Sequence, residues 1–156
     1  MLAKRLRFVL PLIFIALVVV FIWSNSLMDA ETSDSQSDFV GEIMQEILDV
    51  EKSPIDYIFE NRRAVAHFLE FALLGVSVAL FLTLNLPRRL LFFTCGAVCG
   101  FLVAVIDECI QIFVPGRAAE LTDLALDCGG VLCGILGIAL LAFLCRLIIS
   151  KLKKQT

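Results

Sequence analysis

Long apolar runs alternate with short polar segments along this chain of 156 residues. Four runs approach or exceed the roughly 17 to 25 residues that an α-helix needs to cross about 30 Å of hydrocarbon. They cover residues 8–23, 65–84, 90–106 and 124–149. None of them alternates at every second residue, as the strands of a membrane β-barrel do. Because backbone polar groups inside a bilayer are satisfied only in helices or closed barrels, the pattern predicts an all-α bundle of about four transmembrane helices.

The composition supports this prediction. Hydrophobic residues make up 60% of the chain and charged residues 19%, against roughly 45 to 50% and about 25% in ordinary soluble domains. We therefore expect residues 1–156 to form a single membrane domain whose main partner is the lipid bilayer. The net charge of −3 gives no reason to expect a nucleic-acid partner, and the pattern leaves the oligomeric state open.

The basic residues predict the orientation of the helices. Nine of the thirteen Lys and Arg residues lie near the chain ends or between the second and third runs: Lys4, Arg5, Arg7, Arg88, Arg89, Arg146, Lys151, Lys153 and Lys154. Since such residues concentrate in cytoplasmic segments, we predict a multi-pass protein of the cell membrane with both termini in the cytoplasm. Alternatively, the first run is a cleaved signal peptide, because its basic start, short apolar stretch and the small residues Ser24 and Ser26 fit a cleavage pattern.

The outer segment, residues 24–63, contains a helical pattern of its own. Apolar residues repeat at helical spacing on one face, and acidic or amide residues occupy the other. The apolar set is Phe39, Val40, Ile43, Met44, Ile47 and Leu48, and the polar set is Glu42, Gln45, Glu46 and Asp49. The pattern favours an extracytoplasmic amphipathic helix that lies as a lid over the bundle, and a solvated acidic linker is the alternative.

Ionisable residues open the second apolar helix. Arg63, His67 and Glu70 are spaced four and three apart, so they share one helix face. Glu70 would lie roughly 10 Å deeper than Arg63, at about 1.5 Å of rise per residue. A carboxylate at that depth is costly unless it faces a partner or water, which marks this face as a candidate site.

The third helix brings further polar groups to the same outer end, because it runs opposite to the second. Asp107, Glu108 and Gln111 lie near its end, and Arg117 is the only basic residue of the loop that follows. We expect Arg117 to be the counter-charge of these acids.

The fourth helix begins with Asp123 and Asp127 and continues with Gly130, Gly134 and Gly137. These positions advance by four, three, four and three, so they form one stripe. A pair of small residues four apart lets another helix approach closely. That contact would carry both aspartates toward the interior of the bundle.

The six cysteines all fall in or at the ends of apolar segments: Cys95, Cys99, Cys109, Cys128, Cys133 and Cys145. We expect small core residues rather than disulfides or a zinc site, because none lies in the long polar segment and no pair has the two-residue gap of a metal motif.

These motifs together resemble the VanZ family of bacterial membrane proteins over nearly the whole chain. The matching stretches are Ser24-Asn25-Ser26 followed by Ser33; Arg63-x-x-x-His67-x-x-Glu70-Phe71-x-x-Leu74-Gly75; Asp107-Glu108-x-x-Gln111-x-Phe113-Val114-Pro115-Gly116-Arg117; and Asp123-x-x-x-Asp127-x-x-Gly130-x-x-x-Gly134. Two positions depart from the family pattern, since Ile110 replaces a frequent histidine and Ala64 a frequent lysine. The resemblance implies a cell-envelope protein, in a family named after a protein that confers low-level resistance to the glycopeptide teicoplanin.

The leading functional hypothesis is an outer polar site that binds an amphipathic or lipid-linked ligand. Arginines would hold an anionic headgroup, and the carboxylates and the histidine would meet hydroxyl or amine groups. The candidate ligand-binding residues are Arg63, His67, Glu70, Asp107, Glu108, Gln111, Arg117, Asp123 and Asp127. This hypothesis requires no cofactor and assigns no metal site.

Three other interpretations stay open. In an enzyme, the candidate catalytic residues would be His67, Glu70, Asp107 and Glu108, acting by acid–base or metal-assisted chemistry. No nucleophile motif accompanies them, so an enzyme is the less expected outcome. A transporter or proton relay would need polar groups in the cytoplasmic halves of the helices, where the sequence has almost none. In the simplest interpretation, the charged groups only neutralise and orient one another.

Overall fold

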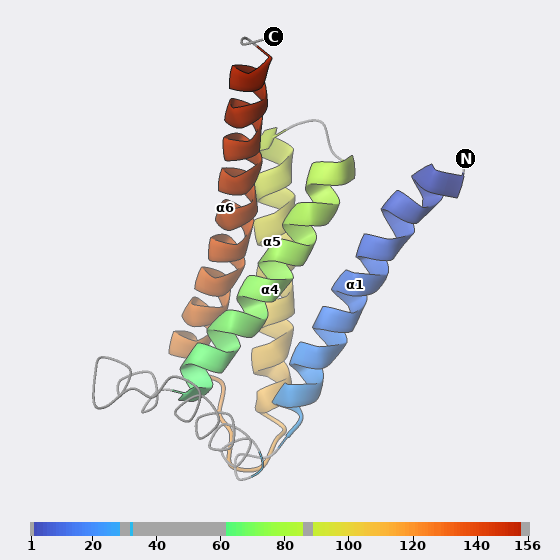
Figure 1. Ribbon diagram of the computed structural model, residues 1–156. Helices are drawn as coiled ribbons and strands as arrows, with labels where there is room; N and C mark the ends of the chain where they lie inside the picture. Colours follow the sequence, from blue (N-terminus) through green and yellow to red (C-terminus); the bar gives the residue numbers. More distant parts are fainter. Residues whose placement is uncertain (1, 29–31, 33–61, 86–88, 154–156) are drawn as a thin grey trace, which may run out of the picture.

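The computed structural model describes residues 2–28, 32, 62–85 and 89–153, and all of its regular structure is helical. The helices are α1 (Leu2–Ser26), α4 (Arg62–Asn85), α5 (Arg89–Gln111) and α6 (Leu121–Leu152). Figure 1 shows that the start of α1 and the end of α6 lie at the same end of the bundle. The opposite end, called the polar end below, is formed by the last turns of α1 and α5 and the first turns of α4 and α6.

Each of these four helices is long and apolar enough to cross a membrane. The candidate spans are Arg5–Ser26, Arg63–Asn85, Phe93–Gln111 and Leu121–Leu152. The predicted all-α membrane bundle is therefore confirmed. Some helices extend past the apolar runs into polar sequence: the third apolar run ends at Ile106, and α5 continues to Gln111. A helix can continue there because its hydrogen bonds are made by the backbone and do not depend on apolar side chains. The predicted amphipathic lid falls on residues outside those described, so it stays a prediction.

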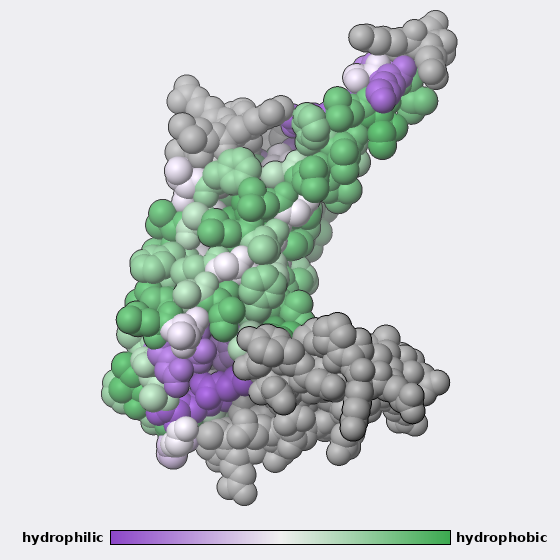
Figure 2. Space-filling model, turned by 90° about the vertical axis from the view of Figure 1, so that its left-hand side faces the viewer, coloured by the Kyte–Doolittle hydropathy of each residue, from purple (hydrophilic) through white to green (hydrophobic). Residues whose placement is uncertain are grey.

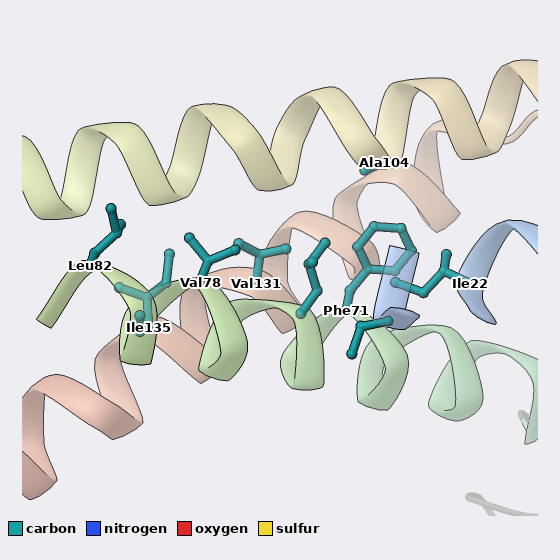
Figure 3. Close-up of a cluster of buried hydrophobic side chains, with 10 residues drawn as sticks. Ile22, Phe71, Val78, Leu82, Ala104, Val131 and Ile135 are labelled. Carbon is teal, nitrogen blue, oxygen red and sulfur yellow. The ribbon is translucent and has the colours of Figure 1, made fainter. Parts of the chain in front are cut away.

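Helix α4 lies at the centre of the bundle. It makes its most extensive contact with α6 and also packs against α1 and α5. Phe71 and Leu74 of α4 are almost fully buried, together with Ile22 of α1, Val131 of α6 and Ala104 of α5 (Figure 3). The core therefore draws on all four described helices, and α1 contributes to it directly.

Glycines allow α4 and α6 to approach each other closely. A Cβ atom at Gly130 would meet the carbonyl oxygen of Phe68, and one at Gly134 would lie 2.7 Å from the backbone nitrogen of Val76. Both contacts are with backbone, which cannot move aside. The predicted helix contact at Gly130 and Gly134 is therefore present, whereas a Cβ at Gly137 would meet nothing within 4 Å. Gly137, about one turn beyond Gly134, therefore lies outside this close approach of the two helices.

The outer surface of the bundle is apolar, with large exposed side chains along every described helix. The expectation that all six cysteines are core residues is wrong for four of them. Cys99, Cys109, Cys133 and Cys145 are exposed, and only Cys95 and Cys128 are half-buried; all six are free thiols. A thiol facing hydrocarbon costs little, because cysteine behaves as a small hydrophobe.

Candidate functional site

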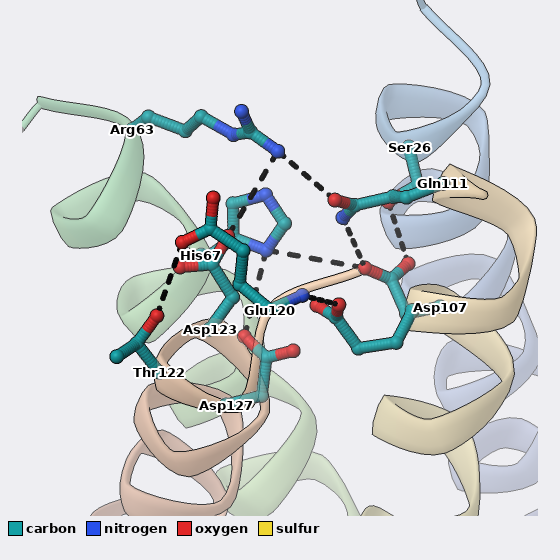
Figure 4. Close-up of polar contacts among 10 residues, drawn as sticks. Ser26, Arg63, His67, Asp107, Gln111, Glu120, Thr122, Asp123 and Asp127 are labelled. Carbon is teal, nitrogen blue, oxygen red and sulfur yellow. Dashed lines mark hydrogen bonds and ion pairs between the residues drawn. The ribbon is translucent and has the colours of Figure 1, made fainter. Parts of the chain in front are cut away.

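Side chains from all four described helices meet at the polar end (Figure 4). This polar cluster consists of Ser26 from α1, Arg63 and His67 from α4, Asp107, Glu108 and Gln111 from α5, and Asp123 and Asp127 from α6. The close approach of α4 and α6 at the glycines brings the first turns of these two helices together, and the last turn of α5 packs beside them.

His67 lies at the centre of the cluster between two carboxylates. Its Nδ1 is 3.5 Å from Asp127 Oδ1 and 3.9 Å from Asp107 Oδ2. The His67 side chain is 10% exposed and both aspartate side chains are fully buried. The two distances are longer than an ordinary hydrogen bond, so the three side chains face one another without forming short hydrogen bonds.

Asp107 is fixed by two donors from neighbouring elements. Ser26 Oγ donates to its Oδ1 at 2.6 Å, and Gln111 Nε2, one turn further along α5, donates to its Oδ2 at 3.1 Å. These bonds hold the carboxylate with Oδ2 toward His67 (Figure 4). Asp107 is therefore a well-anchored group.

Arg63 forms the rim of the cluster. Its guanidinium donates to Gln111 Oε1 at 2.9 Å and lies 3.8 Å from Asp123 Oδ2. The arginine thus joins α4 to α5 and α6 while 35% of its side chain stays exposed. Its Nε is buried with no hydrogen-bond partner in the part of the chain that is described.

Glu108 secures the start of α6. Its Oε2 accepts a 2.8 Å hydrogen bond from the backbone N–H of Glu120, the residue that precedes the helix. An orphan N–H at a helix start is commonly satisfied by such a carboxylate. The other oxygen, Oε1, is buried and has no donor among the described residues.

Glu70 faces α1 rather than His67. Its Oε1 accepts a 2.7 Å hydrogen bond from Asn25 Nδ2. The deep carboxylate thus has an amide partner supplied by the first helix, which is the condition for placing such a group at membrane depth.

Arg117 follows the turn between α5 and α6. Gly116 has φ of 76°, a left-handed conformation that glycine adopts without steric cost, and the Arg117 N–H donates to the Val114 carbonyl at 3.2 Å. The Arg117 side chain is half-buried. The cation that bridges α4, α5 and α6 is Arg63, and the expected role of Arg117 as counter-charge stays a prediction.

Asn25 and Ser26 were missing from the candidate residues, although both donate to site carboxylates. A signal for them exists in the sequence, because Ser24-Asn25-Ser26 interrupts the apolar pattern where the first helix reaches the outer end. Their partners lie 45 and 81 residues away, and spacing within one helix does not reveal such contacts.

Three atoms at the centre of the cluster have no hydrogen-bond partner in the described chain: His67 Nδ1 and both carboxylate oxygens of Asp127. Buried polar atoms are nearly always paired in folded proteins. The two oxygens of Asp127 are acceptors, and His67 Nδ1 can donate or accept, so a proton, a cation or a ligand donor would satisfy this group of atoms.

Four apolar helices with a buried His–Asp cluster at one end define a polytopic membrane protein with a polar site at that end of the bundle. The model of the VanZ/LLP1 family matches residues 9–145, and the chain belongs to this family. Comparisons with curated proteins and with solved structures gave no significant match.

Proposed function

We propose that the polar end binds the headgroup of an amphipathic, lipid-linked ligand whose apolar part lies against the helices. The observation that carries this proposal is the position of Arg63. Its guanidinium is held at the rim by Gln111 and Asp123, yet a third of the side chain remains exposed. A guanidinium has five N–H donors in a fork that matches phosphate and carboxylate, so the remaining donors suit an anionic group.

The surface around the site supports the same proposal. Hydrophilic residues gather in a patch at the polar end, directly beside the apolar side of the bundle (Figure 2). Leu69 and Leu73, two to three turns beyond Arg63 on α4, are 60% and 42% exposed. A ligand with its headgroup at Arg63 would have apolar surface for its acyl chain along the same helix.

The acidic groups beside Arg63 would recognise the neutral or basic part of the headgroup. Asp123 is 17% exposed at the rim, and Glu108 has a buried oxygen without a donor in the described chain. Carboxylates accept hydrogen bonds from hydroxyl and amine groups, which abound in glycolipids and glycopeptides. Arg117, in the adjacent loop, is proposed as a second cation for the ligand.

Acylated glycopeptides such as teicoplanin have this chemistry, since they combine a polar peptide and sugars with an acyl chain. Binding such a molecule at the outer membrane surface would keep it from its cell-wall target. The VanZ family takes its name from a protein that confers teicoplanin resistance, which supports this ligand class. The orientation predicted from the basic residues would put the polar end outside.

The lack of ionisable residues beyond the polar end favours a ligand-binding protein over one that conducts ions or protons. Residues 71–85 of α4 and 128–145 of α6 contain no Asp, Glu, Lys, Arg or His. A charge that entered at the polar end would therefore meet no ionisable side chain in these parts of α4 and α6.

The test is direct binding to the full chain in lipid nanodiscs, by microscale thermophoresis with teicoplanin and with the same glycopeptide lacking its acyl chain. We expect saturable binding of the acylated compound, and binding at least about tenfold weaker without the chain. The Arg63→Gln variant should weaken binding about tenfold or more, the loss of one charge-assisted contact.

Arg146→Gln is the matched control, because it removes the same charge from the opposite end of the bundle. Equal affinity for the two glycopeptides would contradict the role of the apolar surface. Equal effects of Arg63→Gln and Arg146→Gln would contradict the position of the headgroup site.

A further inference from the structure

We infer that His67, Asp107 and Asp127 form a binding site for a divalent cation, with one nitrogen and two carboxylate ligands. The site is the buried interior of the polar cluster, whereas the proposed headgroup contacts lie at its rim on Arg63. The two proposals therefore stand on different residues and can fail separately.

The geometry brings one ligand atom from each of three helices to a common point. The candidate ligand atoms of His67, Asp107 and Asp127 all lie within 4.8 Å of one another. Ligands about 2.0 to 2.2 Å from a tetrahedral ion lie roughly 3.4 Å apart. The two distances from His67 Nδ1, 3.5 Å and 3.9 Å, are close to this value, so small side-chain rotations would close the triangle.

The unpaired carboxylate oxygens of Asp127 are a second observation, independent of the distances, that favours a bound cation. Its side chain is fully buried, points at His67 (Figure 4), and has no donor for either oxygen among the described residues. Leaving a buried polar atom unpaired costs about 1 to 3 kcal/mol, and more when the group is charged. A cation between Asp127 and Asp107 would satisfy these oxygens at once.

Charge balance also favours a cation. Two buried carboxylates beside one imidazole leave net negative charge in an interior where isolated charges are expensive. Arg63 contacts Gln111 and Asp123 at the rim, and the structure gives it no ion pair with Asp107 or Asp127 among the described residues. A divalent ion would neutralise both aspartates with His67 as a neutral ligand.

The surrounding contacts resemble the outer shell of a metal site. Ligating carboxylates are usually held by further hydrogen bonds, which orient them and tune the ion. Asp107 receives such bonds from Ser26 and Gln111. Mixed imidazole and carboxylate ligation suits Zn²⁺ or Mn²⁺, and the remaining coordination positions would be filled by water.

The test uses Mn²⁺ as the probe, added to the full chain in nanodiscs and followed by electron paramagnetic resonance. His67 is the sole histidine of the chain, so a ¹⁴N coupling to bound Mn²⁺ would identify it without mutation. The purification tag must contain no histidine. We expect one saturable Mn²⁺ per chain, a ¹⁴N coupling, and displacement by Zn²⁺.

Three variants locate the ion. Asp127→Asn and His67→Gln should lower the affinity for Mn²⁺ more than tenfold, and Ser26→Ala about tenfold through loss of the bond that orients Asp107. Glu120→Gln is the matched control, since it removes a carboxylate exposed at the same end. Its affinity should equal that of the wild type.

Absence of saturable Mn²⁺ and Zn²⁺ binding by the wild type would overturn the inference and leave a protonated His67 as the partner of both aspartates. Bound Mn²⁺ without ¹⁴N coupling, or with unchanged affinity in Asp127→Asn, would place it elsewhere. The spectrum of the wild type decides the question even if a variant does not fold. Loss of teicoplanin binding in Arg63→Gln with Mn²⁺ binding retained would separate this site from the headgroup site.

Discussion

Asn25, in the last turn of α1, donates a 2.7 Å hydrogen bond to Glu70, the sole carboxylate of α4. This bond connects α1 to α4. We expect Asn25→Ala to destabilise the protein by about 1 to 3 kcal/mol, because the half-buried Glu70 would lose its donor. Thermal unfolding in detergent measures the effect. Ser24→Ala is the control, since among the described residues Ser24 bonds only within its own helix, to the Val20 carbonyl, and the variant should leave the melting temperature unchanged.

The α4–α6 contact predicts opposite outcomes for two glycines of one helix. Gly134→Ala would push a methyl group against the backbone of Ala72 and Val76, so it should lower stability by about 1 to 3 kcal/mol or more. Gly137→Ala adds a methyl group in open space and should be neutral. Melting temperatures of the two variants test this, and equal values would mean that the glycines do not set the helix approach.

The packing of α1 predicts that the mature protein keeps it. Val18 and Ile22 are buried in the core, so cleavage after Ser24 or Ser26 would open the bundle beside Phe71. Intact-mass spectrometry of protein purified from membranes should therefore show a chain of 17.3 kDa. A mass lower by that of residues 1–24 or 1–26 would establish the signal-peptide alternative.

The orientation of the bundle can be tested with single cysteines in a background lacking the six native ones. We expect Ala119→Cys, in the exposed loop of the polar end, to react with a membrane-impermeant maleimide in intact cells. Lys151→Cys, at the other end, should react only after permeabilisation. The reverse pattern would invert the predicted topology.

The remaining prediction concerns Arg117 and His67, which we expect to act within one polar site. Partners in one buried network show coupling of roughly 0.5 to 3 kcal/mol rather than additive losses. A double-mutant cycle with Arg117→Ala and His67→Ala, measured by thermal unfolding in detergent, would detect it. Strictly additive losses would make Arg117 a separate surface charge.

The helical class and the composition of the polar end could be predicted from the sequence, because the bilayer permits few alternatives. An apolar run of about 20 residues must become a helix to satisfy its backbone. Antiparallel helices then bring the polar starts of α4 and α6 and the polar end of α5 to one level. Spacing also predicted the glycine contact, since Gly130 and Gly134 lie on one stripe with Asp127.

Pairing within the site was decided only by the tertiary structure. The spacing of residues predicts which face of a helix a side chain occupies. Which side chains of other helices it contacts depends on how each helix is rotated about its axis and shifted along it when the helices pack. Glu70 and His67 share a face of α4, yet Glu70 bonds to α1 and His67 lies between α5 and α6. The exposure of Cys99 on the outside of the bundle could not be predicted from the sequence either, since hydrocarbon and protein interior accept the same side chains. The sequence therefore determined which groups reach the polar end, and the packing of α1, α4, α5 and α6 determined which of them meet.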